Sequence, residues 1–219
     1  MLFSSSLRKC LSGFAHIQTS GWPFIPGFKK PGFSGHWNNT VGFNNVTVGS
    51  SALASNTIGN YNTAVGTGSL QQNTTGIQNT AVGYFALQNN TASGNTAFGE
   101  GALVSNTSGT QNTAVGVIAL STNQTGINNT AVGVEALKNN TASNNTAVGV
   151  TALGANSTGT NNVAVGFQAL QDNSGGFNNI AIGLQAGTIL TTGNSNIYIG
   201  TNAGSPNESN FIRIGTQGN

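Results

Sequence analysis

Few side chains of this 219-residue chain have the chemistry that catalysis or metal binding requires. Its histidines are His16 and His36, and Cys10 is its only cysteine. A structural zinc site takes four nitrogen or sulfur ligands, so one chain supplies too few. A lone cysteine also excludes an intrachain disulfide framework. We therefore expect neither a metal site nor a disulfide scaffold.

The acidic residues are spread widely along the chain, as Glu100, Glu135, Asp172 and Glu208. Each stands at a different place in the sequence repeat described below, so stacking the repeats does not pair two carboxylates. Two carboxylates that share acid–base catalysis must meet at one site. The segment Gly99-Glu100-Gly101 lacks the Lys and Ser/Thr of a phosphate-binding loop. These observations predict a protein that is not an enzyme and needs no cofactor.

The overall composition is that of a nearly neutral, glycine-rich chain. Only 5% of its residues are charged, 37% are hydrophobic, and 32 are glycine. The net charge of +2 and the lack of a basic stripe in the repeats argue against a nucleic-acid partner. No apolar run reaches the ~18 residues of a membrane-spanning helix. The sequence therefore predicts no transmembrane segment.

A short motif, Asn-Thr-Ala-Val-Gly-x-x-Ala-Leu, recurs along most of the chain, for example at 79–87 and 129–137. Its glycines are 16 or 17 residues apart until a last step of 15, and fall at Gly49, Gly66, Gly83, Gly99, Gly116, Gly133, Gly149, Gly166, Gly183, Gly200 and Gly215. This period is too short for a helix pair and is typical of one coil of a β-solenoid. We therefore expect residues 39–219 to form an all-β domain, a parallel β-solenoid of ~16–17-residue coils. About ten coils would make a rod of about 48 Å.

Stacking the coils places equivalent residues of the motif in columns. We expect two short extended pieces per coil, Thr-Ala-Val and Ala-Leu, with Ala and Val on opposite faces of the first. The valine and leucine columns should stabilise the stack, and the asparagines should form amide ladders that hold the turns. These structural ladders are represented by Val82, Val115, Val132 and Val148, by Leu87, Leu120, Leu137 and Leu153, and by Asn79, Asn112, Asn129 and Asn145.

A single solenoid of this composition has a thin hydrophobic core. Each coil offers about one Val, one Leu and two Ala, whereas ordering the backbone costs roughly 1–2 kcal/mol per residue. Burial of a second strand face against other copies would offset this cost. We therefore expect a homotrimer, with the Ala-bearing or the Val-bearing face turned towards the three-fold axis. A monomeric solenoid is the alternative.

Residues 1–38 differ in composition from the repeats. They hold four basic residues and no acid, and the stretch from 21 to 37 is rich in aromatic residues, Gly and Pro. We interpret this segment as an irregular leader that serves as a cap, an anchor or a targeting segment. Trp37 stands 50 residues before Leu87, the length of three coils, where it would close the leucine column. The proposed cap or anchor residues are Trp22, Trp37, Lys29 and Lys30.

The repeats resemble the heads of trimeric autotransporter adhesins (YadA-like), which carry a similar Asn-x-Ala-Val/Ile-Gly-x-x-Ala core. They are more similar still to the Asn-Thr-Ala-Val-Gly-x-x-Ala-Leu repeats of bacterial surface and phage tail-fibre-like proteins. In that group the array often ends in segments similar to residues 197–204 and 208–215. The resemblance implies a left-handed parallel β-roll, trimeric assembly, and adhesion to a glycan or protein ligand. It also implies an extracellular location, on a cell surface or in a virion fibre.

Two other functions are compatible with these repeats. Open coil ends can template further pairing, so the chain is also a candidate subunit of an end-to-end filament. A column of outward threonines is typical of an ice-binding solenoid, and here it comprises Thr63, Thr80, Thr96, Thr113, Thr130 and Thr146. That column is interrupted at Val46, Val163, Ile180 and Ile197, and each strand carries one such threonine. Ice binding is therefore the weaker alternative.

Overall fold

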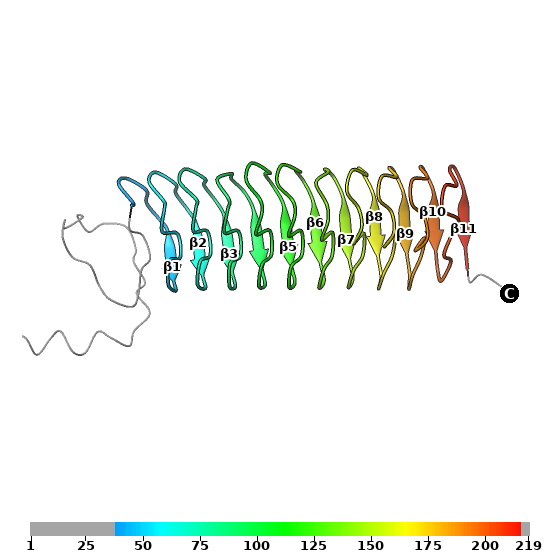
Figure 1. Cartoon of the computed structure of the whole chain (residues 1–219), viewed down its shortest axis with the longest axis horizontal. Helices are drawn as coiled ribbons and strands as arrows, with labels where there is room; N and C mark the ends of the chain where they lie inside the picture. The colour runs from blue at the N-terminus through cyan, green and yellow to red at the C-terminus, as the bar shows by residue number, and fades with distance from the viewer. Residues whose placement is uncertain (1–37, 216–219) are drawn as a thin grey trace, which may run out of the picture.

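The computed structural model of the chain describes residues 38–215, and these form a rod of stacked coils (Figure 1). Each coil contributes one three-residue strand, and the strands pair in chain order into a single parallel sheet. The described residues contain no helix. The predicted all-β solenoid with coils of about 17 residues is thus confirmed. The strands are β1 (Val46–Val48), β2 (Thr63–Val65), β3 (Thr80–Val82), β4 (Thr96–Phe98), β5 (Thr113–Val115), β6 (Thr130–Val132), β7 (Thr146–Val148), β8 (Val163–Val165), β9 (Ile180–Ile182), β10 (Ile197–Ile199) and β11 (Ile212–Ile214).

The register of the sheet keeps equivalent motif residues side by side. Thr113 pairs with Thr130, and Val115 pairs with Val132. The 16-residue coils keep this register too, as β3 and β4 do, because the missing residue is taken from a loop. In the short coil the Asn90 side chain donates to a carbonyl two residues ahead, whereas Asn73 donates to one three residues ahead.

The prediction of a second extended piece at Ala-Leu is wrong, because the leucine of each motif has a left-handed backbone. Leu120 has φ of 51°, which no extended strand permits. Its amide still donates to the carbonyl of Ala136 in the next coil, at 3.0 Å. Hydrogen bonding between coils therefore continues through the turn, although only Thr-Ala-Val is a strand.

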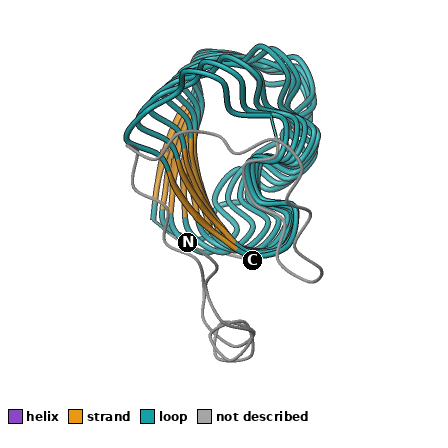
Figure 2. Ribbon diagram, turned by 90° about the vertical axis from the view of Figure 1, so that its left-hand side faces the viewer, coloured by secondary structure: helices purple, strands orange, loops and turns teal. Residues whose placement is uncertain are grey.

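Figure 2 looks along the rod and shows the strands as one wall of each coil, with loops completing the outline. Along a strand, side chains alternate between the interior and the exterior. Ala114 is fully buried inside the coil, while Thr113 and Val115 point outward. A typical coil interior therefore consists of two alanines, one leucine and two asparagines. The valine column lies on the outer face of the sheet and does not fill the core of the chain.

The glycine after each strand is required by the close approach of the next coil. Gly116 has φ of 140°, a conformation that residues with a side chain rarely adopt. A β-carbon at this position would lie 2.3 Å from the carbonyl oxygen of Gly133. The motif glycine thus lets successive backbones stack without a side chain between them.

Candidate functional site

The asparagines predicted to form a ladder do so inside the coils, where all are fully buried. Asn129 donates from its backbone amide to Oδ1 of Asn112 at 3.0 Å, and its Nδ2 donates to the same oxygen at 3.1 Å. Nδ2 also donates to the carbonyl of Ala142 at 2.8 Å. Asn79 and Asn145 occupy equivalent places. Because buried backbone groups require partners, this ladder holds the turns and is not free to contact a ligand.

A second asparagine ladder, which was not predicted from the sequence, runs beside the first. In it Asn123 donates from Nδ2 to Oδ1 of Asn106 at 2.9 Å and to the carbonyl of Gly126 at 3.1 Å. The signal was present in the sequence, because in the 17-residue coils an asparagine precedes the motif asparagine by six residues. The second ladder comprises Asn56, Asn73, Asn90, Asn106, Asn123, Asn140, Asn156 and Asn173. Its side-chain hydrogen bonds run from Asn56 to Asn123 and from Asn140 to Asn173, with Oδ1 of Asn123 unpaired between the two runs.

The leucines of the predicted ladders are fully buried and the valines are not. Leu87, Leu120, Leu137 and Leu153 lie in the interior of successive coils. Val82 is partly exposed, and Val115, Val132 and Val148 are each 37% exposed. Leucine therefore contributes the apolar volume of the core, whereas valine contributes an outer surface.

The outer face of the sheet is uncharged over β5 to β10. Its outward columns hold the first and third strand residues and the residue after the motif glycine. Towards β9 the threonine of the first column is replaced by isoleucine, so the face becomes more apolar. Exposed apolar residues of this face include Val117, Val134, Val150, Phe167, Ile182 and Leu184. Contiguous apolar surface of this kind marks interaction sites on proteins.

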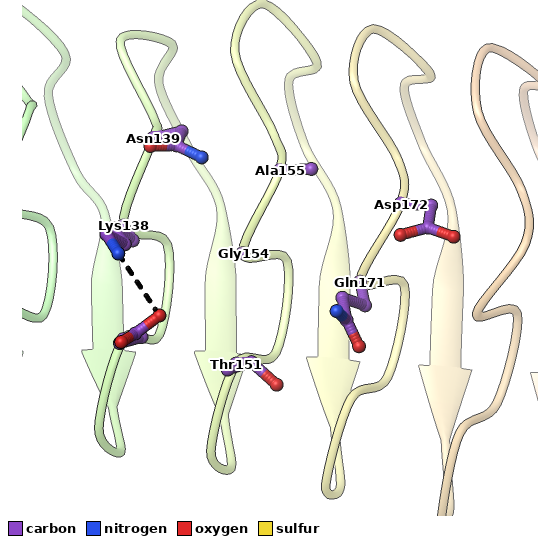
Figure 3. A pocket seen from close by; sticks show the side chains of 8 residues that line it. Lys138, Asn139, Thr151, Gly154, Ala155, Gln171 and Asp172 are labelled. Carbon is purple, nitrogen blue, oxygen red and sulfur yellow. Dashed lines mark hydrogen bonds and ion pairs between the residues drawn. The ribbon is translucent and has the colours of Figure 1, made fainter.

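A shallow notch of about 190 Å³, which we call the polar notch, is lined by turn and loop residues of three successive coils (Figure 3). It forms because Gly154 and Ala155 stand in the coil between Lys138 and Gln171, whose longer side chains border it. Lys138 Nζ lies 3.3 Å from Glu135 Oε2, and both side chains are more than a third exposed. Three of the six charged residues in the described range line this notch, namely Glu135, Lys138 and Asp172, so charge is concentrated here on an otherwise nearly neutral rod.

The notch offers hydrogen-bond donors and acceptors but no catalytic arrangement. The Glu135 carboxylate is paired with an ammonium group, and exposed pairs of this kind contribute little energy. No group of His, Cys, Asp and Glu within residues 38–215 could hold a metal ion. In the same range no helix is long and apolar enough to cross a membrane. The polar side chains that line the notch are available for hydrogen bonds to a polar ligand.

The predicted cap or anchor residues, Trp22, Lys29, Lys30 and Trp37, lie outside the described residues. Comparisons of the chain with protein-family models, with curated proteins and with solved structures find no match. The case for a function therefore depends on the outer sheet face and the notch.

Proposed function

We propose that this chain is a non-enzymatic fibre protein that associates through its outer sheet face and attaches to a host, a matrix or neighbouring subunits. The observation that carries the proposal is the uncharged, partly apolar face over β5 to β10. A solvent-facing sheet normally carries polar side chains on its outer positions. A face of valine, isoleucine and phenylalanine is instead suited to burial against other copies.

The proposed assembly is a homotrimer with the Val-bearing faces turned towards the three-fold axis. Of the two faces considered from the sequence, the Ala-bearing one fills the interior of the coil and is not available. Burial of the remaining exposed apolar area would add stabilisation at about 25 cal/mol per Å². This arrangement leaves the loops and the polar notch facing outward, on a cell surface or in a virion fibre.

Assembly can be tested by placing charges on the face. The pair Val132→Lys and Val165→Lys puts two lysines on β6 and β8, and should reduce the mass in light scattering from three times 22.1 kDa to a single chain. The matched control is Thr125→Lys with Thr158→Lys, which places two lysines on exposed loops of the same spacing. A wild-type protein that is a stable folded monomer at micromolar concentration would refute the trimer.

Attachment can be tested at the notch, where a glycan or protein ligand could hydrogen-bond to Lys138, Gln171 and Asp172. Gly154→Gln fills the notch with the residue found at the equivalent position 171, and Gly154 has no left-handed backbone that would exclude it. Binding of labelled protein to cultured cells and to immobilised glycans should fall. Ala54→Gln fills the same column far from the notch and should not change binding. If Gly154→Gln and Ala54→Gln both bind as well as the wild-type protein, the notch is not part of the attachment surface.

Ice binding is a second candidate because six threonines are aligned on the outer face. The strand register places Thr113 beside Thr96 and Thr130, so their outward hydroxyl groups form a regular row along the rod. Thermal hysteresis of the purified protein distinguishes this function from adhesion. A measurable freezing-point gap, abolished by Thr113→Lys, would favour the ice-binding alternative.

A further inference from the structure

The interior of the rod changes its composition near the C-terminal end of the described residues. In β10 the inward residue is Tyr198, where β2 to β9 have alanine. Glycines replace the large motif leucine at Gly187 and Gly204. A β-carbon on Gly187 would lie 2.8 Å from the Tyr198 ring, and one on Gly204 would lie 3.0 Å from it. The two glycines therefore make room for the buried tyrosine, and the three residues form one matched set.

Behind this ring lies a carboxylate that is hydrogen-bonded on several sides. The Tyr198 hydroxyl donates to Glu208 Oε1 at 2.8 Å, and the Ser205 amide donates to the same oxygen at 3.1 Å. Arg213 donates from Nε to Oε1 at 2.9 Å and from Nη2 to Oε2. The Glu208 side chain is only 6% exposed. Both oxygens of this buried carboxylate thus have a hydrogen-bond partner, and the donors come from β10, from the loop after it and from β11.

The shifted pKa values of Glu208 and Tyr198 keep each group in the protonation state that its hydrogen bonds require. The hydrogen bond from Arg213 lowers the pKa of Glu208, so the carboxylate is ionised at neutral pH. Burial and the hydrogen bond to Glu208 raise the pKa of Tyr198, so its hydroxyl stays a donor. A paired and hydrogen-bonded charge can be kept at the edge of a protein interior. Removal of Arg213 would leave the buried Glu208 carboxylate without a compensating positive charge.

Arg213 stands at the inward position of β11, in register with Tyr198. Its guanidinium also lies 5.2 Å from the centre of the Phe211 ring. The neighbouring strand residues, Ile212 and Ile214, are 69% and 74% exposed. β11 therefore has two apolar outward residues, as β9 does, and differs from β9 in carrying a charge where β9 has alanine.

We propose that the Tyr198–Glu208–Arg213 cluster closes the interior of the rod and that Arg213 guards β11 against pairing with the strand edge of a second copy. Strand edges template pairing with other chains, and an inward-pointing charge is a device that prevents it. The strand edge of a second copy stacked on β11 would cover the guanidinium and the carboxylate. This inference goes beyond the proposed function, because it concerns the length of the rod and not its lateral association. It also argues against end-to-end filament growth at this end.

The test is Arg213→Ala combined with Glu208→Gln in the full chain, which makes β11 read Ile-Ala-Ile, like β9, and leaves no unpaired carboxylate behind it. Rods in electron micrographs should become about twice as long, joined at their C-terminal ends. Arg213→Lys keeps a charge at the position and should leave the length unchanged. Glu208→Gln keeps the guanidinium but removes its ion pair. It should also leave the length unchanged, while amide hydrogen exchange in β11 becomes at least about ten times faster.

Rod length is measured independently of lateral assembly. The proposal for β11 can therefore be refuted while the proposed trimer is supported, and the trimer can be refuted while the proposal for β11 is supported. Rods of unchanged length in the variant that carries both Arg213→Ala and Glu208→Gln would overturn the proposal, whether β11 stays protected from hydrogen exchange or not. Longer rods in Arg213→Lys would also overturn it, because the positive charge at this position would then not be what prevents pairing of β11. Protection of the β8 and β9 amides in every variant shows that the remaining coils are folded.

Discussion

Gly166→Ala should weaken the array much more than Gly175→Ala, although both variants add one methyl group to the same coil. Gly166 follows β8 with φ of 138°, and a β-carbon there would lie 2.2 Å from the carbonyl oxygen of Gly183. Gly175 has no left-handed φ, and its β-carbon would lie 3.3 Å from the Thr158 hydroxyl oxygen. A hydroxyl on a side chain can turn away, but a backbone carbonyl within the stack cannot.

The magnitude of each effect follows from these contacts. Backbone strain at Gly166→Ala costs about 1–3 kcal/mol, and crowding against the next coil adds about 1–3 kcal/mol. The expected loss of unfolding free energy is therefore about 2–6 kcal/mol. Gly175→Ala should change stability little, or raise it by about 0.4–1 kcal/mol, because alanine restricts the unfolded chain.

Urea unfolding followed by circular dichroism measures both variants in the full chain. Because stacked repeats interact mainly with their neighbours, hydrogen exchange should also show the loss concentrated in the coils of β8 and β9. Two variants of equal stability, within about 0.5 kcal/mol, would refute the claim that close backbone approach fixes the motif glycine.

Three further outcomes follow from the interior. Leu120→Asp should prevent folding, as judged by circular dichroism, because it buries a carboxylate without a partner. Asn129→Leu leaves the buried Asn145 amide without its acceptor, whereas the Ala142 carbonyl keeps the Asn140 side chain as a donor, and chemical denaturation should show a loss of about 1–3 kcal/mol. The depressed pKa of Glu208 makes its contribution complete above the unfolded value of 4.5 and lost as pH falls through the lower folded value. The protection of the β11 amides, measured relative to their intrinsic exchange rates, should therefore fall below about pH 4.5, and Glu208→Gln should remove this dependence.

The period of the motif was sufficient to predict the coils, because equivalent residues at a fixed spacing must stack. The alternation of Ala114 and Val115 was predictable as well, because successive side chains of a strand point to opposite faces. The sequence did not show which face lies inside. Valine is the more apolar residue, which favours its burial, but alanine is the residue that fits the narrow interior. The left-handed backbone of Leu120 was also unpredictable from residue type, since leucine rarely adopts it.

The polar features of the structure depend on contacts between coils that spacing alone does not reveal. Asn123 belongs to a ladder visible in the sequence as a recurring asparagine, but its buried role requires the turn geometry. The loss of the leucine column at Gly187 and Gly204 was visible too. The reason for it, the Tyr198 ring and its carboxylate partner Glu208, required the three-dimensional arrangement.

Disulfide cross-linking between copies tests the central claim, association through the outer sheet face, most directly. Val132→Cys places a thiol on that face, and Thr125→Cys places one on an exposed loop of the preceding coil; both are made with Cys10→Ser so that the new thiol is alone. Mild oxidation should link two chains through residue 132 and should not do so through residue 125. Cross-linking through residue 125 alone, or through neither, would contradict assembly through this face.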